Sequence, residues 1–172
     1  MKHVAPVLPD AAGEDFESLL SDLSAAFVRV SVEEIDSEVD RWLERIVLAM
    51  GVDRSTIAQV DPTDEGLYVS HQWARPGFST PIRGLRAADA RRLFPWLLEK
   101  VLAGEPVVIS QIDDIPREAT RDRDYFLQNG NKSQVTIPLK VGGTVVGAVS
   151  FGAIRFGKKW SEQEVQRPQI GR

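Results

Sequence analysis

The stretch from residue 133 to residue 152, SQVTIPLKVGGTVVGAVSFG, constrains the fold of this chain most strongly. Two runs of alternating apolar residues meet at Val-Gly-Gly-Thr, and both glycines can adopt the positive φ of a tight turn. The stretch is therefore predicted to form an antiparallel hairpin. Because helical patterns precede it, it favours an α+β domain with helices on one face of an antiparallel sheet and loops or short helices roofing the other. A roofed face can enclose a pocket, so the pattern favours a receptor over an enzyme.

Length and composition fit one globular domain without covalent cross-links. The chain has 172 residues, a net charge of -4 and no cysteine. The lack of cysteine excludes disulfides, thiolate metal sites, thiol catalysis and thioether-linked chromophores, and it fits a reducing cytoplasm, where we expect the protein to lie. Net acidity gives no footprint for direct nucleic-acid binding. No apolar run approaches the ~20 residues of a membrane span.

Two amphipathic helices are predicted before the sheet, at residues 14–29 and from Ile35 to Met50, where Gly51 can end the second helix. Besides the hairpin, strands are predicted at residues 54–60, 67–74 and 106–110. Short helices are predicted at residues 95–103 and 113–128, and a final helix from Ser161 that Pro168 interrupts. The irregular connection at residues 75–86 is a candidate lid.

These elements give a simple domain organisation. We expect a flexible N-terminal tail at residues 1–13, one domain at residues 14–167, and a C-terminal tail at residues 168–172 with no output domain after it.

Catalytic signatures are absent from the sequence. There is no phosphate-binding loop, dinucleotide loop or nucleophile elbow. His71 lies on a predicted strand without a ligand-spaced partner, and we interpret it as packed or hydrogen-bonded. Asp113 and Asp114 are interpreted as a turn, and the Arg-Asp-Arg-Asp run at residues 121–124 as a solvated helix face with local ion pairs. We expect no catalytic residue and no metal site.

A pocket is predicted from aromatic and polar side chains on the sheet and on its roof. Aromatic residues commonly line ligand pockets, although they also fill cores. Gln134 and Thr136 share one face of a central strand and need partners if buried: a ligand, water or neighbouring groups. Ser150 shares that face if the hairpin pairs in simple register. Regular alternation over residues 67–74 places four side chains on one face: Leu67, Val69, His71 and Trp73. The candidate ligand-binding residues are Trp73, Phe94, Trp96, Tyr125, Gln134 and Thr136.

The order of these segments resembles the GAF domain family over roughly residues 16–165. The matching segments include GVDRSTIAQV, LYVSHQWA, GEPVVIS and DDIPREA. The most specific piece is Ser-x4-Pro-Leu-x3-Gly-x3-Gly at residues 133–147, and Trp-Ser-Glu-Gln-Glu at residues 160–164 supports it. This variant resembles the GAF domains found N-terminal to bacterial sensor kinases, AAA+ transcriptional activators and LuxR-type regulators.

The resemblance implies a PAS-related fold, with a six-stranded antiparallel sheet and the N- and C-terminal helices on one face. It implies a sensory pocket for a small molecule on the other face and no catalysis. It also implies a homodimer formed through the terminal helices, and relay to a C-terminal kinase or transcription-activator output domain, as in two-component systems.

Two kinds of GAF ligand lack support in these residues. A covalent bilin is excluded because there is no cysteine. The Asn-Lys-x-Phe-Asp-Glu signature of cyclic-nucleotide-binding members is absent, since Asn131-Lys132-Ser133 matches only its start. The cofactor therefore stays open.

The leading interpretation is a sensory domain that binds a small molecule non-covalently. The alternative is a structural dimerisation module with a full core and no ligand. A cavity with unsatisfied polar groups beside Trp73, Gln134 and Thr136 would favour the first. Methionine-sulfoxide reduction, which some free-standing GAF proteins perform, needs cysteines and is rejected.

Overall fold

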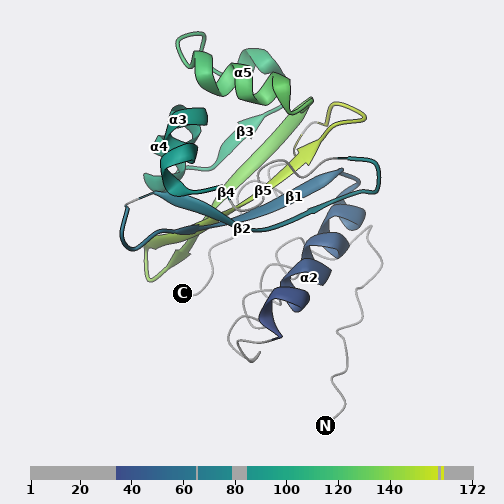
Figure 1. The fold of residues 1–172 in the computed structure, drawn as a ribbon. Coiled ribbons are helices and arrows are strands. Elements are labelled where there is room, and N and C mark those ends of the chain that lie inside the picture. The colour runs from purple at the N-terminus through teal and green to yellow at the C-terminus, as the bar shows by residue number, and fades with distance from the viewer. Residues whose placement is uncertain (1–33, 65, 79–84, 159, 161–172) are drawn as a thin grey trace.

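Five antiparallel strands form the centre of the computed structural model (Figure 1), which describes residues 34–64, 66–78, 85–158 and 160. Within these residues the strand order is β2-β1-β5-β4-β3. The strands are β1 Arg54–Val60, β2 Leu67–Ala74, β3 Val107–Ile109, β4 Ser133–Val141 and β5 Thr144–Ala153. Each expected strand position is therefore occupied, and both hairpin strands have a neighbour on each side.

Glycines fix the β4–β5 hairpin in two ways. At its turn, Gly142 and Gly143 adopt φ of 57° and 82°, in the left-handed region that glycine tolerates. Gly147 meets a different need, because a Cβ there would lie 2.4 Å from the backbone oxygen of Ala58 on β1. Only glycine lets the two strands approach this closely.

The sheet has five strands among the described residues, not the six that the resemblance implies. In the part of the chain that the structure describes, one backbone hydrogen bond lies beyond the outer edge of β2, from the Val69 N–H to the Leu85 carbonyl at 3.0 Å. One bond does not make a ladder. The chain leaving β2 also carries Pro76 and Gly77, which disfavour strand structure.

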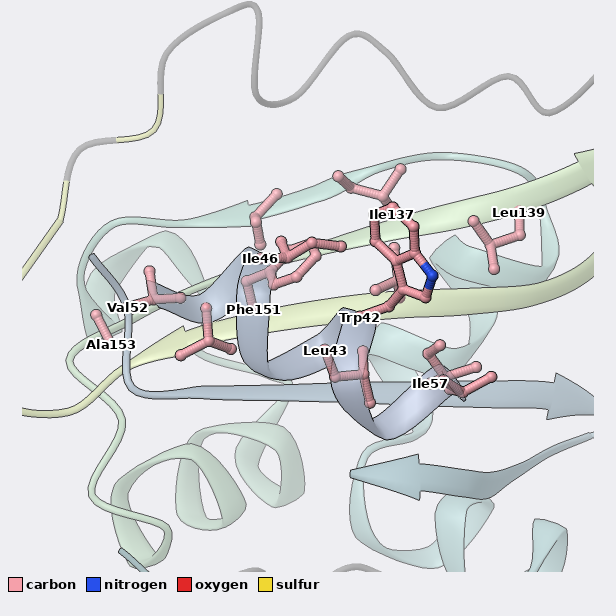
Figure 2. Close-up of a cluster of buried hydrophobic side chains, with 13 residues drawn as sticks. Trp42, Leu43, Ile46, Val52, Ile57, Ile137, Leu139, Phe151 and Ala153 are labelled. Carbon is pink, nitrogen blue, oxygen red and sulfur yellow. The ribbon is translucent and has the colours of Figure 1, made fainter. Parts of the chain in front are cut away.

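Helix α2, Ile35–Met50, covers one face of the sheet. Gly51 ends it with a φ of 66°, as the sequence predicts. Its apolar stripe packs on alternate residues of β1, β4 and β5 and forms the larger core (Figure 2). Trp42 of the helix and Phe151 of β5 are at most 2 % exposed, so this face is filled.

Short helices cover the opposite face (Figure 1). They are α3 Ala87–Leu93, α4 Pro95–Leu102 and α5 Thr120–Gln128, with the 3-10 turn η1 Ile112–Asp114 before α5. In η1, the Asp114 carboxylate accepts hydrogen bonds from the backbone N–H groups of Ser110 and Gln111 at 2.7 and 3.1 Å. The turn interpretation of this acidic pair is therefore confirmed.

A β-bulge in β2 changes which side chains face each side of the sheet. Val69 pairs with Ala58 of β1, and His71 pairs with Ile57, so Ser70 is the extra residue. The single-face prediction for four residues of this strand is therefore wrong. Leu67 and Val69 face the short helices, whereas His71 and Trp73 face α2.

Several expectations fall outside the described residues. They concern the tails at residues 1–13 and 168–172, the helix at residues 14–29 and the final helix from Ser161. The candidate lid at residues 75–86 is described only at its two ends. Within the described part of the chain, the helices are too short or too polar to cross a membrane.

Candidate ligand pocket

A cavity of about 90 Å³ lies between the sheet and helices α4 and α5. Strand register arranges its floor in three rows that run across β1, β5 and β4. The rows are Arg54–Gly152–Gln134, Thr56–Ser150–Thr136 and Ala58–Ala148–Pro138. All of these residues except Pro138 line the cavity. The floor therefore changes from charged and amide groups, through hydroxyl groups, to apolar groups.

The roof follows the same gradient. Above the apolar row, Leu98 and Val101 of α4 pack with Ala148 of β5 and Leu67 of β2. Toward the polar row, the lining comes from Tyr125 of α5 and from the chain that follows this helix. The cavity thus has an apolar end and a polar end.

Hydrogen bonds connect the side chains of the polar end. Asn131 Nδ2 donates to Gln134 Oε1 at 3.0 Å, and Gln134 Nε2 donates to Thr136 Oγ1 at 3.0 Å. The hydroxyl oxygens of Thr136 and Ser150 lie 2.8 Å apart. Ser150 therefore shares the face of Gln134 and Thr136, and both of these residues find partners within the fold.

Arg54 brings a cation to this end of the cavity. The residue is 7 % exposed, and Nη2 donates to the Asn129 carbonyl at 3.3 Å and to Asn131 Oδ1. Both acceptors are neutral. Burial lowers the pKa of the Arg54 guanidinium, although Tyr125 and Asp53 act in the opposite direction. The cation is thus held in a poorly solvated place.

Tyr125 supplies a donor without a partner. Its hydroxyl oxygen is buried and makes no hydrogen bond to any described residue. The ring is fixed by Phe94, with 5.2 Å between the ring centroids. Burial raises the pKa of the phenol, and the nearby Asn129 side chain and Arg54 only partly oppose this. The hydroxyl therefore stays protonated at neutral pH and can donate.

Asp122 of α5 caps the neighbouring helix α4. Its two carboxylate oxygens accept hydrogen bonds from the backbone N–H groups of Trp96 and Leu97 at 3.1 and 2.9 Å. Phe94 occupies the N-cap position of α4, and its apolar side chain cannot accept these hydrogen bonds. Burial raises the Asp122 pKa, while these two hydrogen bonds lower it. Asp122 is 4 % exposed, so the solvated-face interpretation of the 121–124 run is wrong for this residue.

The structure brings five of the six candidate site residues together. Phe94, Trp96, Tyr125, Gln134 and Thr136 all line the cavity. Trp73 does not, because the bulge at Ser70 turns it toward α2, where it packs against the larger core. The placement of Trp73 in the pocket is thus corrected.

Sequence reasoning missed Arg54, Asn131 and Asp122 as lining residues. The sequence does hold a signal for Arg54. In a β-strand, residues two apart point to the same face, so Arg54 lies on the face of Thr56 and opposite to Ile57. For Asp122 there is no local signal, because its partners lie 25 and 26 residues away in the sequence.

The lining of the cavity offers hydrogen-bonding groups and apolar groups that can bind a ligand. Among the described residues, no group of three or more His, Cys, Asp or Glu side chains could hold a metal. His71 lies on the other face, with Nε2 2.7 Å from Asp36 Oδ1 and Nδ1 2.9 Å from Ser70 Oγ. It is hydrogen-bonded, as the sequence interpretation holds.

Comparison with known proteins agrees with this architecture. The fold is similar to the phycocyanobilin-bound GAF domain of a cyanobacterial phytochrome, with a TM-score of 0.65 and 18% identity over 88% of this chain and 86% of that one. It is also similar to the far-red absorbing dark state of JSC1_58120g3 with bound biliverdin, with a TM-score of 0.59 and 17% identity over 86% and 89% of the two chains.

A third similar structure comes from a signalling protein. It is a domain of a two-component sensor histidine kinase protein from Sinorhizobium meliloti 1021, described as putative in its own name, with a TM-score of 0.51 and 19% identity over 78% and 81% of the two chains. A search of curated proteins finds no match. The GAF domain family model matches residues 34–169. This span includes every strand and helix described above, and the chain therefore belongs to the GAF domain family.

Proposed function

We propose that this chain is a sensory module that binds a small molecule non-covalently in the cavity beneath α4 and α5. GAF domains are sensory domains and are generally not catalytic. The observation that carries the proposal is the cavity itself, which lies between the sheet and the short helices and is polar at one end and apolar at the other. A core built only for stability would have no reason to keep this space.

The similar structures support the proposal that this fold can bind a ligand. They do not support a bilin as the ligand of this chain. Two of them hold a bilin, whereas this chain has no cysteine for a thioether link. A cavity of about 90 Å³ is also far below the roughly 300–1,000 Å³ of pockets for drug-sized ligands. A tetrapyrrole does not fit the space between the sheet and the roof, so we assign no bilin chemistry to this chain.

Contacts within the roof offer a route by which a ligand could act on more than its own site. The tilted rings of Tyr125 and Phe94 are in contact, and the Asp122 carboxylate holds the first turn of α4. A ligand that moved α5 would therefore also move α3 and α4. Relay through the terminal helices to a kinase or transcription-activator domain is part of the proposal. It requires that the ligand prefer one arrangement of the roof over another.

A thermal-shift screen tests the proposal, using the purified chain against organic acids, amino acids, nucleotides and aromatic metabolites. A ligand at 100 times its dissociation constant adds about 2.7 kcal/mol, which raises Tm by about 5–10 °C for a domain of this size. The control is Ala148→Leu, which fills the apolar end of the cavity. The shift should be lost in this variant while the protein still unfolds cooperatively.

The dimerisation module remains the competing function. Leu48 of α2 is 49% exposed, so this helix presents one large apolar side chain to solvent. If no compound shifts the Tm of the wild type, and the chain sediments as a dimer that Leu48→Glu dissociates, the module replaces the sensor. A ligand shift that survives Ala148→Leu would place binding outside the cavity and would equally overturn the proposal.

A further inference from the structure

We propose that the cavity selects a short-chain monocarboxylate, with the carboxylate group between Arg54 and Tyr125 and the alkyl end toward Ala148 and α4. The inference rests on the proposed function and specifies its ligand class. It follows from the polarity of the two ends, from the unused donor and from the size of the space.

The polar end offers donors that converge. Arg54 and Tyr125 both line the cavity, from the floor and from the roof respectively. Two Arg54 hydrogen bonds reach the neutral oxygens of Asn129 and Asn131 and hold the guanidinium at this end of the cavity. The Tyr125 hydroxyl has no acceptor among the described residues. A buried donor without an acceptor is costly, and an incoming anion would supply one.

The pKa directions agree with this geometry. Burial lowers the pKa of the Arg54 guanidinium, while Tyr125 and Asp53 act to raise it. Arg54 and Tyr125 each act on the pKa of the other, which agrees with their shared place in the lining of the cavity. An anion between them would stabilise the charged guanidinium and accept the phenolic proton in a hydrogen bond.

The remaining acidic group does not oppose an anion strongly. Asp122 lines the same cavity, but both of its oxygens accept hydrogen bonds from the first turn of α4. The positive end of the α4 dipole therefore offsets its charge.

The apolar end and the volume set the rest of the ligand. Phosphate and sulfate have oxygens on all sides and would leave several of them against apolar groups such as Ala58, Ala148 and Val101. A carboxylate has oxygens on one side and carbon on the other. Because an apolar cavity of about 150 Å³ holds benzene, a cavity of about 90 Å³ corresponds to about four non-hydrogen atoms. Acetate and propionate are of this size.

The test is calorimetric titration of the full chain with acetate, propionate, butyrate and hexanoate. Propionamide serves as the neutral match of propionate, and propylammonium as the cationic match. We expect saturable 1:1 binding of acetate or propionate. Propionamide and hexanoate should bind at least about tenfold more weakly, since the first lacks the charge and the second exceeds the space.

Tyr125→Phe gives the sharpest variant, because it removes only an oxygen that has no hydrogen-bond partner among the residues that the structure describes. The ring contact with Phe94 is kept, so the variant should fold with an unchanged or higher Tm. Carboxylate affinity should fall about 10- to 100-fold, as for a lost hydrogen bond to a charged group. The matched control is Tyr68→Phe, whose hydroxyl donates to Gln59 Oε1 at 3.1 Å outside the cavity. Tyr68→Phe should leave carboxylate affinity unchanged.

Each alternative outcome is decisive. If propionamide binds as well as propionate, or if Tyr125→Phe binds carboxylates as the wild type does, the ligand class is wrong, whereas the binding itself upholds the sensory proposal. If no carboxylate binds but another compound in the thermal-shift screen does, the class is again wrong and the cavity function stands. If nothing binds in either experiment, the proposed function fails together with the inference.

Discussion

The two faces of this sheet come from the same strands but differ in how they are packed. Along β4, Val135 and Ile137 point into the filled core beneath α2, while Gln134 and Thr136 line the cavity beneath α4 and α5. The first pair is at most 1 % exposed and purely apolar. The second pair is polar, and a side-chain hydrogen bond joins its two members. Alternate residues of one strand thus face a filled core on one side and a cavity on the other.

This separation has a physical basis. Burying apolar surface against α2 provides the stability of the fold, so the opposite face can keep a cavity and a buried cation, both of which cost stability. If this comparison is right, substitutions on the α2 face should act mainly on unfolding, and those on the cavity face mainly on ligand binding.

The largest effect is expected for Phe151→Ala on the α2 face. Phe151 is fully buried, and removing such a ring costs about 3–5 kcal/mol of unfolding free energy. The preceding residue gives the control, because Ser150→Ala on the cavity face loses one hydroxyl contact and should cost about 1 kcal/mol. Urea unfolding measures both. Equal losses would show that the faces do not differ in this way.

Asp53→Asn is expected to cost about 2 kcal/mol at neutral pH, as for the loss of charge-assisted hydrogen bonds. The carboxylate accepts hydrogen bonds from Ile154 N–H at 2.6 Å and Arg155 N–H at 2.9 Å, and it pairs with Arg75 at 3.4 Å. Asp53 therefore connects the start of β1 to the chain that follows β5.

The effect of this substitution should depend on pH. Burial acts to raise the pKa of Asp53. Hydrogen bonds from Arg155 and Ile154, together with the positive charge of Arg155, nevertheless hold this pKa below its ordinary 3.8. A lowered folded pKa gives stability above the unfolded value, which is lost as the pH falls through the folded value. The difference between wild type and Asp53→Asn should shrink below about pH 4. A constant difference down to pH 2 would show that the charge is not responsible.

The same substitution, alanine to leucine, should change the free energy of unfolding in opposite directions on the two faces of the sheet. Ala153→Leu on β5 overfills the α2 core and is expected to cost about 1–3 kcal/mol. Ala148→Leu on the same strand enters the cavity and should be neutral or stabilise by about 0.5–2 kcal/mol. Thermal unfolding of the two variants measures this directly. A comparable loss in Ala148→Leu would mean that the cavity cannot accept three further carbon atoms.

The smallest effect on stability is expected for Tyr125→Phe. Because its hydroxyl has no partner among the described residues, the free energy of unfolding should stay within about 0.5 kcal/mol of the wild type or rise. A loss above about 1 kcal/mol in urea unfolding would reveal a partner for the hydroxyl. The same variant separates binding from folding in the carboxylate titration.

The sequence by itself determined the local elements. Apolar alternation with Gly142 and Gly143 gave the central hairpin, and helical spacing with Gly51 gave α2 and its end. These features depend on neighbours within a few residues, which is why a single sequence carries them. The alternation also placed Gln134, Thr136 and Ser150 on one face. The same alternation places Arg54 on the face of Thr56, although Arg54 is not among the site residues predicted from the sequence.

The tertiary structure alone decided where these faces meet the rest of the chain. The extra residue Ser70 in β2 reversed the alternation and moved Trp73 from the expected pocket to the α2 core. A bulge depends on how two strands register, and no local pattern specifies it. The hydrogen bond from the start of α4 to Asp122, and the contact of Tyr125 with Phe94, likewise join residues far apart in sequence. Such contacts form only when the helices settle on the sheet, and they determine the chemistry of the cavity.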